Sequence, residues 1–188
     1  MRSRTQSLVL CGLSIALLAA GAAIVFPLGP IPVTLQTLML MLIVLVLTPK
    51  EAVVAVGGYL LLGVIGLPVF AGFSGGFGIL LGPTGGFLVG FFIGSLVAAL
   101  LRNVIKPRLT GKRSLMALDI FSILVVILIY DVMGMLWFMH ITGSAFMAAI
   151  TLSVLPFIVP DIIKAVAAFT CAQPIRIALK RNDSMTNK

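Results

Sequence analysis

The sequence predicts an all-α membrane protein, with six transmembrane helices in a single domain. Three observations predict this fold class. First, hydrophobic residues make up 61% of the 188 residues, charged residues only 10%, and the mean hydropathy is +1.25. A soluble domain is typically about half apolar and about a quarter charged. Second, the apolar residues fall into six runs, and third, the basic residues gather between and beyond those runs.

Each apolar run is a candidate helix, because a bilayer core of about 30 Å needs about 20 apolar residues in helical form. The runs cover residues 8–26, 33–47, 52–66, 87–105, 115–139 and 157–179. The second and third runs are shorter, and the motif "TPKE" ends the second. We expect the first run to be retained as a helix and not cleaved as a signal peptide, since it is long and further spans follow it.

The basic residues predict the orientation of these helices. Thirteen Lys and Arg against five acidic residues give a net charge of +8. In a soluble protein this charge would suggest nucleic acid, but here the basic clusters flank apolar runs, which favours topology and contact with anionic lipid headgroups. If the N-terminus lies inside, every Lys and Arg except Lys164 falls in an inner segment. The positive-inside rule therefore predicts that both termini are cytoplasmic.

The segment at 67–86, between the third and fourth runs, is predicted to be an outer loop of unusual composition. In "LPVFAGFSGGFGILLGPTGG", nine of the 20 residues are Gly or Pro and none is charged. An apolar, glycine-rich loop is expected to pack against the protein, where its backbone approaches another group closely. Two interpretations remain open at this point: a tight connector that dips into the bilayer surface, or a lid over a cavity.

Small residues recur at every fourth position in two segments. One strip is Gly12, Ala16 and Ala20, with Ala19 and Ala23 beside it; the other is Gly82, Gly86, Gly90 and Gly94. Residues four apart share a helix face, so each strip predicts a surface that another helix can approach closely. Each strip is expected either to pack within the bundle or to dock another membrane protein, and the first helix is the better candidate for docking.

Two opposite charges interrupt the sixth run in "PFIVPDIIKAVAAF". Asp161 and Lys164 are three residues apart and share a helix face. An isolated charge at the centre of a spanning helix costs ~2.5–3.5 kcal/mol, so the pair is either a structural ion pair or a polar binding site. Because Pro160 suits the first turn of a helix, we expect the pair near the outer end of this helix, lining an outward-facing cavity.

The fifth run contains the polar and aromatic motif "YDVMGMLW". Tyr130 and Trp137 offer apolar surfaces with a polar edge, which suit either a stacking surface for a ligand or an interfacial aromatic belt. After Asp161 and Lys164, Asp131 is a third ionisable residue, predicted at a similar depth in the membrane. We expect it to pair with Lys164 or to face the cavity.

Further polar side chains precede the second run, in "PLGPIPVTLQ". Thr34 and Gln36 can donate and accept hydrogen bonds near the outer face. The lone His140 is expected to be solvated. Cys11 and Cys171 lie inside apolar runs and are expected to be small core or lipid-facing residues, not a disulfide or a metal site.

The sequence contains no ATP-binding loop and no zinc-protease motif. It has no G-x-x-x-x-G-K-[ST] and no H-E-x-x-H. The letters of G-x-S-x-G occur once, in "GFSGG" within the glycine-rich outer segment, but the chain has a single His and no evident nucleophile–base cluster. "GPTGG" is glycine-rich but lacks the lysine of a phosphate-binding loop. If the protein moves a solute uphill, the energy must therefore come from a partner or from an ion gradient.

Five motifs in order along the chain are similar to those of a known family. They are "IPVTLQT", "YLLLGVIGLPVFAG", "GPTGGFLVGF", "YDVMGMLW" and "PFIVPDIIKA". On these motifs the chain resembles, over roughly residues 8–178, the BioY family. Members of this family are the biotin-specific substrate-binding (S) components of energy-coupling-factor (ECF) transporters.

The resemblance implies a six-helix S-component fold, with an outward-open vitamin pocket capped by the extracellular loop at 67–86. It implies biotin as the ligand, no cofactor, and a location in the cytoplasmic membrane of a prokaryote. The implied partners are membrane lipid, a transmembrane coupling (T) component and two ATP-binding-cassette (ABC) ATPases, with no nucleic acid. ATP hydrolysis on the partners would topple the S component in the membrane. The docking strip of the first helix would consist of Gly12, Ala16 and Ala20, with Ala19 and Ala23.

The chemistry of biotin fits the polar residues of these motifs. Asp161 would accept hydrogen bonds from the ureido N–H groups, and Lys164 would donate to a carbonyl or carboxylate. Because the two side chains are only ~5–6 Å apart, we expect them to serve one end of the ligand, the ureido end. The other end would be held by Thr34 or Gln36 and by loop backbone amides such as that of Gly78.

Aromatic residues would enclose the apolar thioether ring. Tyr130, Trp137 and Phe87 are the candidates. The family usually reads "GPTGGY", so Phe87 lacks a phenol hydroxyl near the pocket; we expect stacking on the ligand to remain and one hydrogen bond to it to be affected. Three rival functions remain: an S component for another vitamin, a membrane-embedded enzyme, and a purely structural bundle subunit. A structural role predicts that variants of Asp161 and Lys164 lose folding and not ligand binding.

Overall fold

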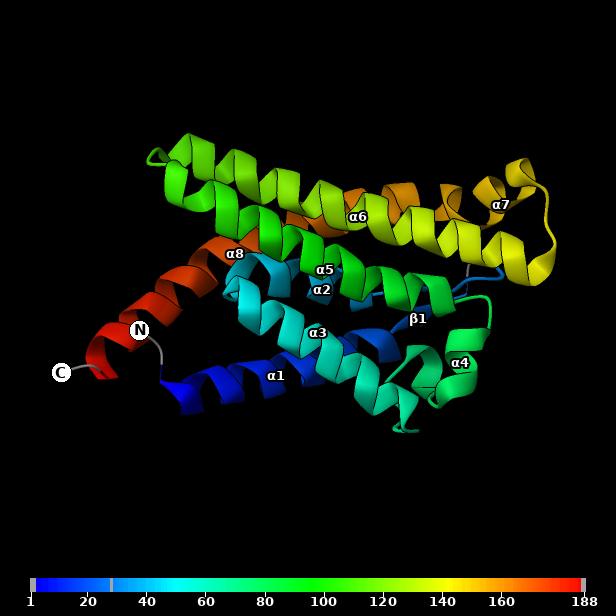
Figure 1. Ribbon diagram of the computed structural model, residues 1–188, viewed down its shortest axis with the longest axis horizontal. Helices are drawn as coiled ribbons and strands as arrows, with labels where there is room; N and C mark the ends of the chain where they lie inside the picture. The colour runs from blue at the N-terminus through cyan, green and yellow to red at the C-terminus, as the bar shows by residue number, and fades with distance from the viewer. Residues whose placement is uncertain (1–2, 28, 187–188) are drawn as a thin grey trace.

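The computed structural model describes residues 3–27 and 29–186, and this part of the chain is predominantly helical (Figure 1). The long helices are α1 (Arg4–Ala23), α2 (Gln36–Val46), α3 (Pro49–Val64), α5 (Gly85–Ile105), α6 (Lys112–Thr142) and α8 (Leu155–Thr186). The short elements are β1 (Val25–Phe26), β2 (Val33–Thr34), η1 (Ala71–Phe73), α4 (Phe77–Leu81), η2 (Lys106–Arg108) and α7 (Phe146–Ser153). Each of the six predicted runs therefore contains one long helix.

Within the described residues, four helical segments are long and apolar enough to cross a membrane. They are Arg4–Ala23, Gly85–Arg108, Lys112–Thr142 and Phe146–Arg181. The helix Gln36–Val46 is apolar but short. Large apolar side chains are exposed along these helices, including Leu128 and Ile163, each 63% exposed. Such a surface is stable when lipid covers it. The structure thus supports a multi-helix membrane protein, with four candidate spans identified by length and composition.

The connection between α1 and α2 is a short β-hairpin. Val25 pairs with Thr34 and Phe26 pairs with Val33 in antiparallel register. The predictions that the first helix reaches residue 26 and that the second begins at 33 were therefore wrong. Three prolines lie between the strands, and the paired residues include β-branched Val25, Val33 and Thr34, which favour extended backbone.

The motif "TPKE" begins α3, three residues earlier than predicted. The Thr48 hydroxyl oxygen accepts a hydrogen bond from the Glu51 backbone N–H at 3.4 Å, and Glu51 Oε2 accepts one from the Thr48 N–H at 2.9 Å. This reciprocal pair is a capping box, and Pro49 supplies a preset φ at the first helical position. The carboxylate of Glu51 also accepts a hydrogen bond from Ser7 of α1 at 2.7 Å, which joins the two helices.

Helices α5 and α6 lie side by side (Figure 1), and glycines of α5 make their close approach possible. A Cβ atom at Gly90 would lie 2.6 Å from Tyr130 Cα, and one at Gly94 would lie 3.3 Å from Val126 Cα. A Cβ at Gly86 would collide with Trp137. This strip packs within the bundle, as one of the two interpretations predicted. Gly82 does not belong to it, because this residue ends α4 before α5 begins.

The small-residue strip of α1 faces outward. Helix α1 packs on α2 and α3 through other residues, among them Leu18 and Ala22. Gly12, Ala16 and Ala20 are exposed, while Ala19 and Ala23 are partly buried. The interpretation that this strip packs within the bundle is therefore wrong for its three central residues.

Two opposite ends of the molecule are visible in Figure 1. Both termini and the turn between α5 and α6 lie at one end, which we call the termini end, and α4 and α7 lie at the other, which we call the cap end. Helix α8 runs between them, but it begins at Leu155 and not at Pro160. Pro160 is therefore the sixth helical residue and not part of the first turn as predicted, which places Asp161 about 9 Å into the helix.

Candidate functional site

A cavity of about 150 Å³ lies toward the cap end, between the starts of α2 and α5, the middle of α6 and the first half of α8. The segment between α3 and α5 covers it. Its lining residues are Ile31, Pro32, Thr34, Gln36, Thr37, Phe70, Ala71, Ser74, Ile79, Thr84, Phe87, Leu88, Phe91, Tyr130, Phe157 and Lys164. Most of these side chains are apolar, and a few polar groups stand at defined positions. This combination is typical of a small-molecule site.

The polar wall of the cavity is a network centred on Asp161. Lys164 Nζ donates to Asp161 Oδ1 and to Thr37 Oγ1, each at 2.9 Å. The Thr37 hydroxyl lies 3.2 Å from the same carboxylate oxygen, and the Tyr130 hydroxyl donates to Asp161 Oδ2 at 2.5 Å. Asp161 is 2% exposed and Lys164 is 6% exposed. Side chains from α2, α6 and α8 therefore meet at one buried carboxylate.

This network leaves specific hydrogen-bonding capacity unused. An ammonium group has three N–H donors, and Lys164 uses two of them within the network. A carboxylate has about four acceptor positions, and Asp161 uses three, two on Oδ1 and one on Oδ2. One donor on Lys164 and one acceptor position on Asp161 are left for another molecule.

Gln36 provides a further unused donor on the cavity wall. Its side chain is 3% exposed and lies near the Tyr59 hydroxyl, but its Nε2 makes no hydrogen bond of good geometry among the described residues. A buried amide without a partner costs about 1–3 kcal/mol, so such groups are uncommon unless a ligand satisfies them. Thr34 lies beside it and accepts a hydrogen bond from the Gln36 backbone N–H at 3.3 Å.

Aromatic rings form the apolar wall. Phe87 and Phe157 lie with their ring centroids 6.0 Å apart, and Phe91 meets Tyr130 edge to face at 5.3 Å. The ring of Phe87 fits against α6 only because residue 134 is glycine, since a Cβ there would collide with the Phe87 ring. Gly134 therefore sets how far Phe87 withdraws from the cavity.

The covering segment is held by contacts at both of its ends. Phe70 is 1% exposed, and its ring occupies the space where a Cβ at Gly63 would stand. The Tyr59 hydroxyl donates to the Val69 carbonyl at 2.9 Å. At the other end, Trp137 Nε1 donates to the Gly82 carbonyl at 3.0 Å. The segment is therefore packed against the protein, as its glycine-rich, apolar composition predicted.

The structure brings together most of the predicted site residues, but not all of them. Thr34, Gln36, Phe87, Tyr130 and Lys164 line the cavity, and Asp161 lies directly behind Lys164 and Tyr130. Two predicted residues lie outside the lining. Trp137 points toward Gly82, and Gly78 lies in α4 with no atoms within 4 Å of where its Cβ would stand.

Asp131 does not take either of its predicted positions. The ion pair of Lys164 is with Asp161, and Asp131 is not among the residues that line the cavity. Its Oδ1 is buried without a hydrogen-bond partner in the described part of the chain. Tyr130 points into the network, so the next residue along α6 turns about 100° away from it.

Several lining residues were missed by the sequence analysis. Thr37 completes the Lys164 network, and Phe70, Phe91 and Phe157 form much of the apolar wall. Thr37 stands in the quoted motif "IPVTLQT" directly after Gln36, so the sequence could have identified it as a candidate site residue. The three phenylalanines carry no such signal, because an apolar residue in an apolar run looks the same whether it faces lipid, core or cavity.

Comparison with known proteins shows the family of the chain and its fold. The sequence pattern of the BioY family matches residues 1–181. A protein of Pyrococcus horikoshii named probable biotin transporter BioY is 43% identical over 176 residues, which cover 94% of this chain and 98% of that protein. The biotin transporter BioY2 of Lactococcus lactis subsp. cremoris is 36% identical over 187 residues, which cover 99% of this chain and 96% of that protein.

A solved structure has the same fold. It is a crystal structure of the S-component for biotin from an ECF-type ABC transporter, and it matches with a TM-score of 0.83. The match covers 94% of this chain and 95% of the other, at 23% sequence identity. At this identity the likeness shows the fold alone.

Proposed function

The chain belongs to the BioY family, and from this premise we propose that it binds biotin and takes it up as the substrate-binding subunit of an ECF-type ABC transporter. The observation that carries the proposal is the covered cavity with the Thr37–Tyr130–Asp161–Lys164 network on its wall. Biotin has complementary chemistry: two ureido N–H donors, one ureido carbonyl, an apolar ring and a carboxylate.

The ureido ring fits the unused groups of the network. The free N–H of Lys164 donates to the ureido carbonyl oxygen, and the remaining acceptor position of Asp161 takes one ureido N–H. Tyr130 and Thr37 hold the carboxylate and the ammonium in place for this contact. The two charges therefore serve the same end of the ligand.

The carboxylate end of biotin fits the side of the cavity formed by Gln36. Its unpartnered Nε2 donates to a carboxylate oxygen, assisted by Thr34 and by backbone N–H groups of the covering segment. Phe87, with the neighbouring rings of the apolar wall, encloses the thioether ring. This arrangement needs no cofactor.

We propose that the segment 67–86 is the extracellular cap over the bound biotin. Gly78 contributes backbone in α4, and Trp137 anchors the end of that helix through Gly82. These two residues act on the ligand through the cap, which must open for biotin to enter. Glycines at positive φ, such as Gly72 and Gly76, permit the tight turns of this segment.

The proposed topology has six membrane spans with both termini in the cytoplasm. Helices α2 and α3 make the two shorter spans, and the basic residues of the termini end face the cytoplasm under the positive-inside rule. The protein then lies in the cytoplasmic membrane of a prokaryote, with its cavity toward the outside. Its sequence carries no ATPase motif, so the energy comes from two ABC ATPases through a T component. The exposed strip of Gly12, Ala16 and Ala20 on α1 is the proposed docking surface for that T component.

Biotin binding to the purified protein tests the proposed function. We expect saturable binding by isothermal titration calorimetry, with no displacement by thiamine or riboflavin. Displacement by either vitamin, or the absence of any biotin binding by folded protein, would overturn the assignment. The sharpest variant is Gln36→Met, because it removes the unpartnered donor and keeps the volume of the side chain.

The Gln36→Met variant separates a ligand contact from a structural one. Loss of one hydrogen bond to a charged carboxylate weakens biotin binding by about tenfold or more. The unfolding midpoint without biotin stays the same or rises, because a buried donor without a partner destabilises the fold. Asn103→Met, an exposed amide on α5, is the matched control and leaves biotin affinity unchanged. A lower midpoint with unchanged affinity would show that Gln36 is structural.

A further inference from the structure

A second cavity, of about 330 Å³, lies at the termini end of the bundle, opposite to the first. Along α2 it begins near Leu45, nine residues and about 13 Å from Gln36 of the first cavity. It is lined by Leu45, Val46, Leu47, Thr48, Pro49, Arg102, Lys106, Lys112, Leu115, Met116, Leu118, Asp119, Gln173, Arg176, Ile177 and Lys180. None of these residues belongs to the proposed biotin site.

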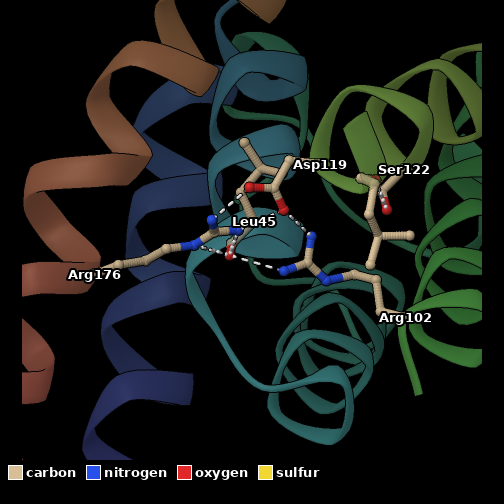
Figure 2. A network of polar contacts seen from close by, with 6 residues as sticks. Leu45, Arg102, Asp119, Ser122 and Arg176 are labelled. Atoms are coloured by element: carbon tan, nitrogen blue, oxygen red, sulfur yellow. Dashed lines mark hydrogen bonds and ion pairs between the residues drawn. The ribbon is translucent and has the colours of Figure 1, made fainter. Parts of the chain in front are cut away.

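The floor of this cavity is a rigid group of charges, shown in Figure 2. Arg102 Nη1 donates to Asp119 Oδ1 at 2.9 Å, and Arg176 donates to both oxygens of the same carboxylate, at 2.5 and 2.8 Å. Both guanidinium groups also donate to the backbone carbonyl of Leu45 near the end of α2. Two arginines from α5 and α8 are thus fixed in position by one carboxylate and one carbonyl.

This cavity carries a large excess of positive charge. Five cations line it, namely Arg102, Lys106, Lys112, Arg176 and Lys180, and Asp119 is the only acid among the described lining residues. Five positive charges and one negative charge leave a formal net charge of +4. Lys106 lies within electrostatic reach of three cations, Arg102, Arg176 and Lys180, and of one acid, Asp119. Like charges this close repel one another, so an anion among them would stabilise the group.

A buried donor also lacks an acceptor here. Arg102 is 4% exposed, lines the cavity, and its Nε has no hydrogen-bond partner among the described residues. Arginine and lysine together are the side chains that bind phosphate oxygens, arginine through its planar group and lysine as a mobile point charge. The cavity therefore offers both parts of a phosphate site: a fixed guanidinium floor and exposed lysines at its rim.

The remaining lining indicates where that phosphate comes from. Leu115, Met116 and Ile177 line the same cavity, and Ile177 is 68% exposed on the outer surface of α8. A free phosphate ion gains nothing from contact with apolar side chains. A phospholipid has a phosphate directly joined to apolar chains, and in a membrane it would lie against these exposed apolar residues.

We propose that this cavity binds the phosphate group of an anionic phospholipid at the membrane surface of the termini end. Lys106, Lys112 and Lys180 contact the phosphate oxygens above the fixed arginines, and the acyl chains lie along Leu115 and Ile177. The lipid thereby neutralises the charge that gathers where α5, α6 and α8 meet. This inference does not depend on the ligand of the first cavity.

Native mass spectrometry of the full chain tests the proposal, with phosphatidylglycerol and phosphatidylcholine as probes. We expect wild-type protein to retain phosphatidylglycerol preferentially, and the double variant Lys106→Gln/Lys180→Gln to retain about 30-fold less. That figure follows because each lysine near an anionic lipid contributes roughly a factor of five. The arginines are left in place so that the fold is preserved.

The matched control is Arg108→Gln/Arg113→Gln, which removes two charges from the same end but outside the cavity. It should retain phosphatidylglycerol like the wild type. Equal retention by both double variants would overturn the proposal, as would equal retention of the two lipids. An arm with inorganic phosphate tests the source: if phosphate displaces phosphatidylglycerol at equal concentration, the site is for a free anion and the lipid assignment is wrong. Biotin binding by the lysine variant should match the wild type, which keeps the test separate from the proposed function.

Discussion

Two buried charged networks in this molecule have similar parts and opposite properties. Each centres on one aspartate, Asp161 at 2% and Asp119 at 4% exposure, and each joins α2, α6 and α8. At Asp161 the cation is a lysine with one N–H to spare, and the network borders an aromatic cavity. At Asp119 two arginines hold one carboxylate and the Leu45 carbonyl through six hydrogen bonds.

The difference shows that a buried charge does not by itself identify a ligand site. The Asp119 carboxylate also accepts three hydrogen bonds, but all of them come from two arginines that tie helices together, and the excess charge of this network is positive. The Asp161 network keeps one donor and one acceptor position unused beside a cavity. Unused hydrogen-bonding capacity next to empty volume is therefore the better sign of a ligand, because a buried group without a partner costs free energy that a ligand can recover.

The largest expected effect comes from breaking the network at the termini end. Asp119→Asn leaves two buried or half-buried guanidinium groups facing each other without a counter-charge, which should lower the free energy of unfolding by about 3–5 kcal/mol. Thermal or denaturant unfolding in detergent measures this change. Biotin affinity of the fraction that remains folded should not change. Stability within about 0.5 kcal/mol of wild type would show that the network does not hold the helices together.

The next largest effect should appear in binding, at the other network. Lys164→Met keeps the length of the side chain but removes the donor proposed for the ureido carbonyl, so biotin affinity should fall by about tenfold to a hundredfold, or ~1.5–3 kcal/mol. Stability should fall less than in Asp119→Asn, because Asp161 keeps its hydrogen bonds from Tyr130 and Thr37. Calorimetric titration and an unfolding curve on the same sample measure both quantities. If Lys164→Met leaves biotin affinity unchanged but reduces stability, then the Asp161 network, like the Asp119 network, has a structural role.

The smallest effect tests whether the shape of the first cavity, apart from its charged groups, contributes to biotin binding. In Gly134→Ala the added Cβ collides with the ring of Phe87, which must shift toward the cavity. Overpacking of this kind costs roughly 1–3 kcal/mol, and part of that cost should appear as about a tenfold loss of biotin affinity. The matched control is Gly12→Ala on the exposed face of α1, where the added Cβ meets nothing within 4 Å. If Gly134→Ala binds biotin like the wild type, Phe87 does not shape the site.

The sequence predicted the helices better than it predicted their ends. All six apolar runs became helices, because apolar length and composition are local properties. The ends depended on turn and cap chemistry: prolines beside Val25 and Val33 produced a hairpin, and "TPKE" followed the end of α2 as predicted but also started α3. The capping box was readable from the sequence, since a Thr followed three residues later by Glu is its signature.

The site was predicted in part. Asp161 and Lys164 stood out because two opposite charges in an apolar run are rare, and their spacing places them on one face. Residues flanking them in space were harder to assign. Asp131 and Trp137 also carry polar groups and lie in the same motif as Tyr130. Only Tyr130 reaches the network, because the rotation of α6 against α5 and α8 selects which face points inward.

The sequence by itself determined that this is a helical membrane protein, and that one helix carries two opposite charges, Asp161 and Lys164, on the same face within an apolar run. These properties follow from residue composition and from the 3.6-residue period of a helix, which are encoded over short distances. Only the tertiary structure decided that Thr37 and Tyr130 complete that pair, that the α1 strip faces outward, and that Arg102 and Arg176 share Asp119. These are contacts between segments far apart in the chain. They depend on how closely two helices approach and on how each helix is rotated. Glycines such as Gly90 and Gly134 permit the close approach because they have no side chain that would collide with the neighbouring residues.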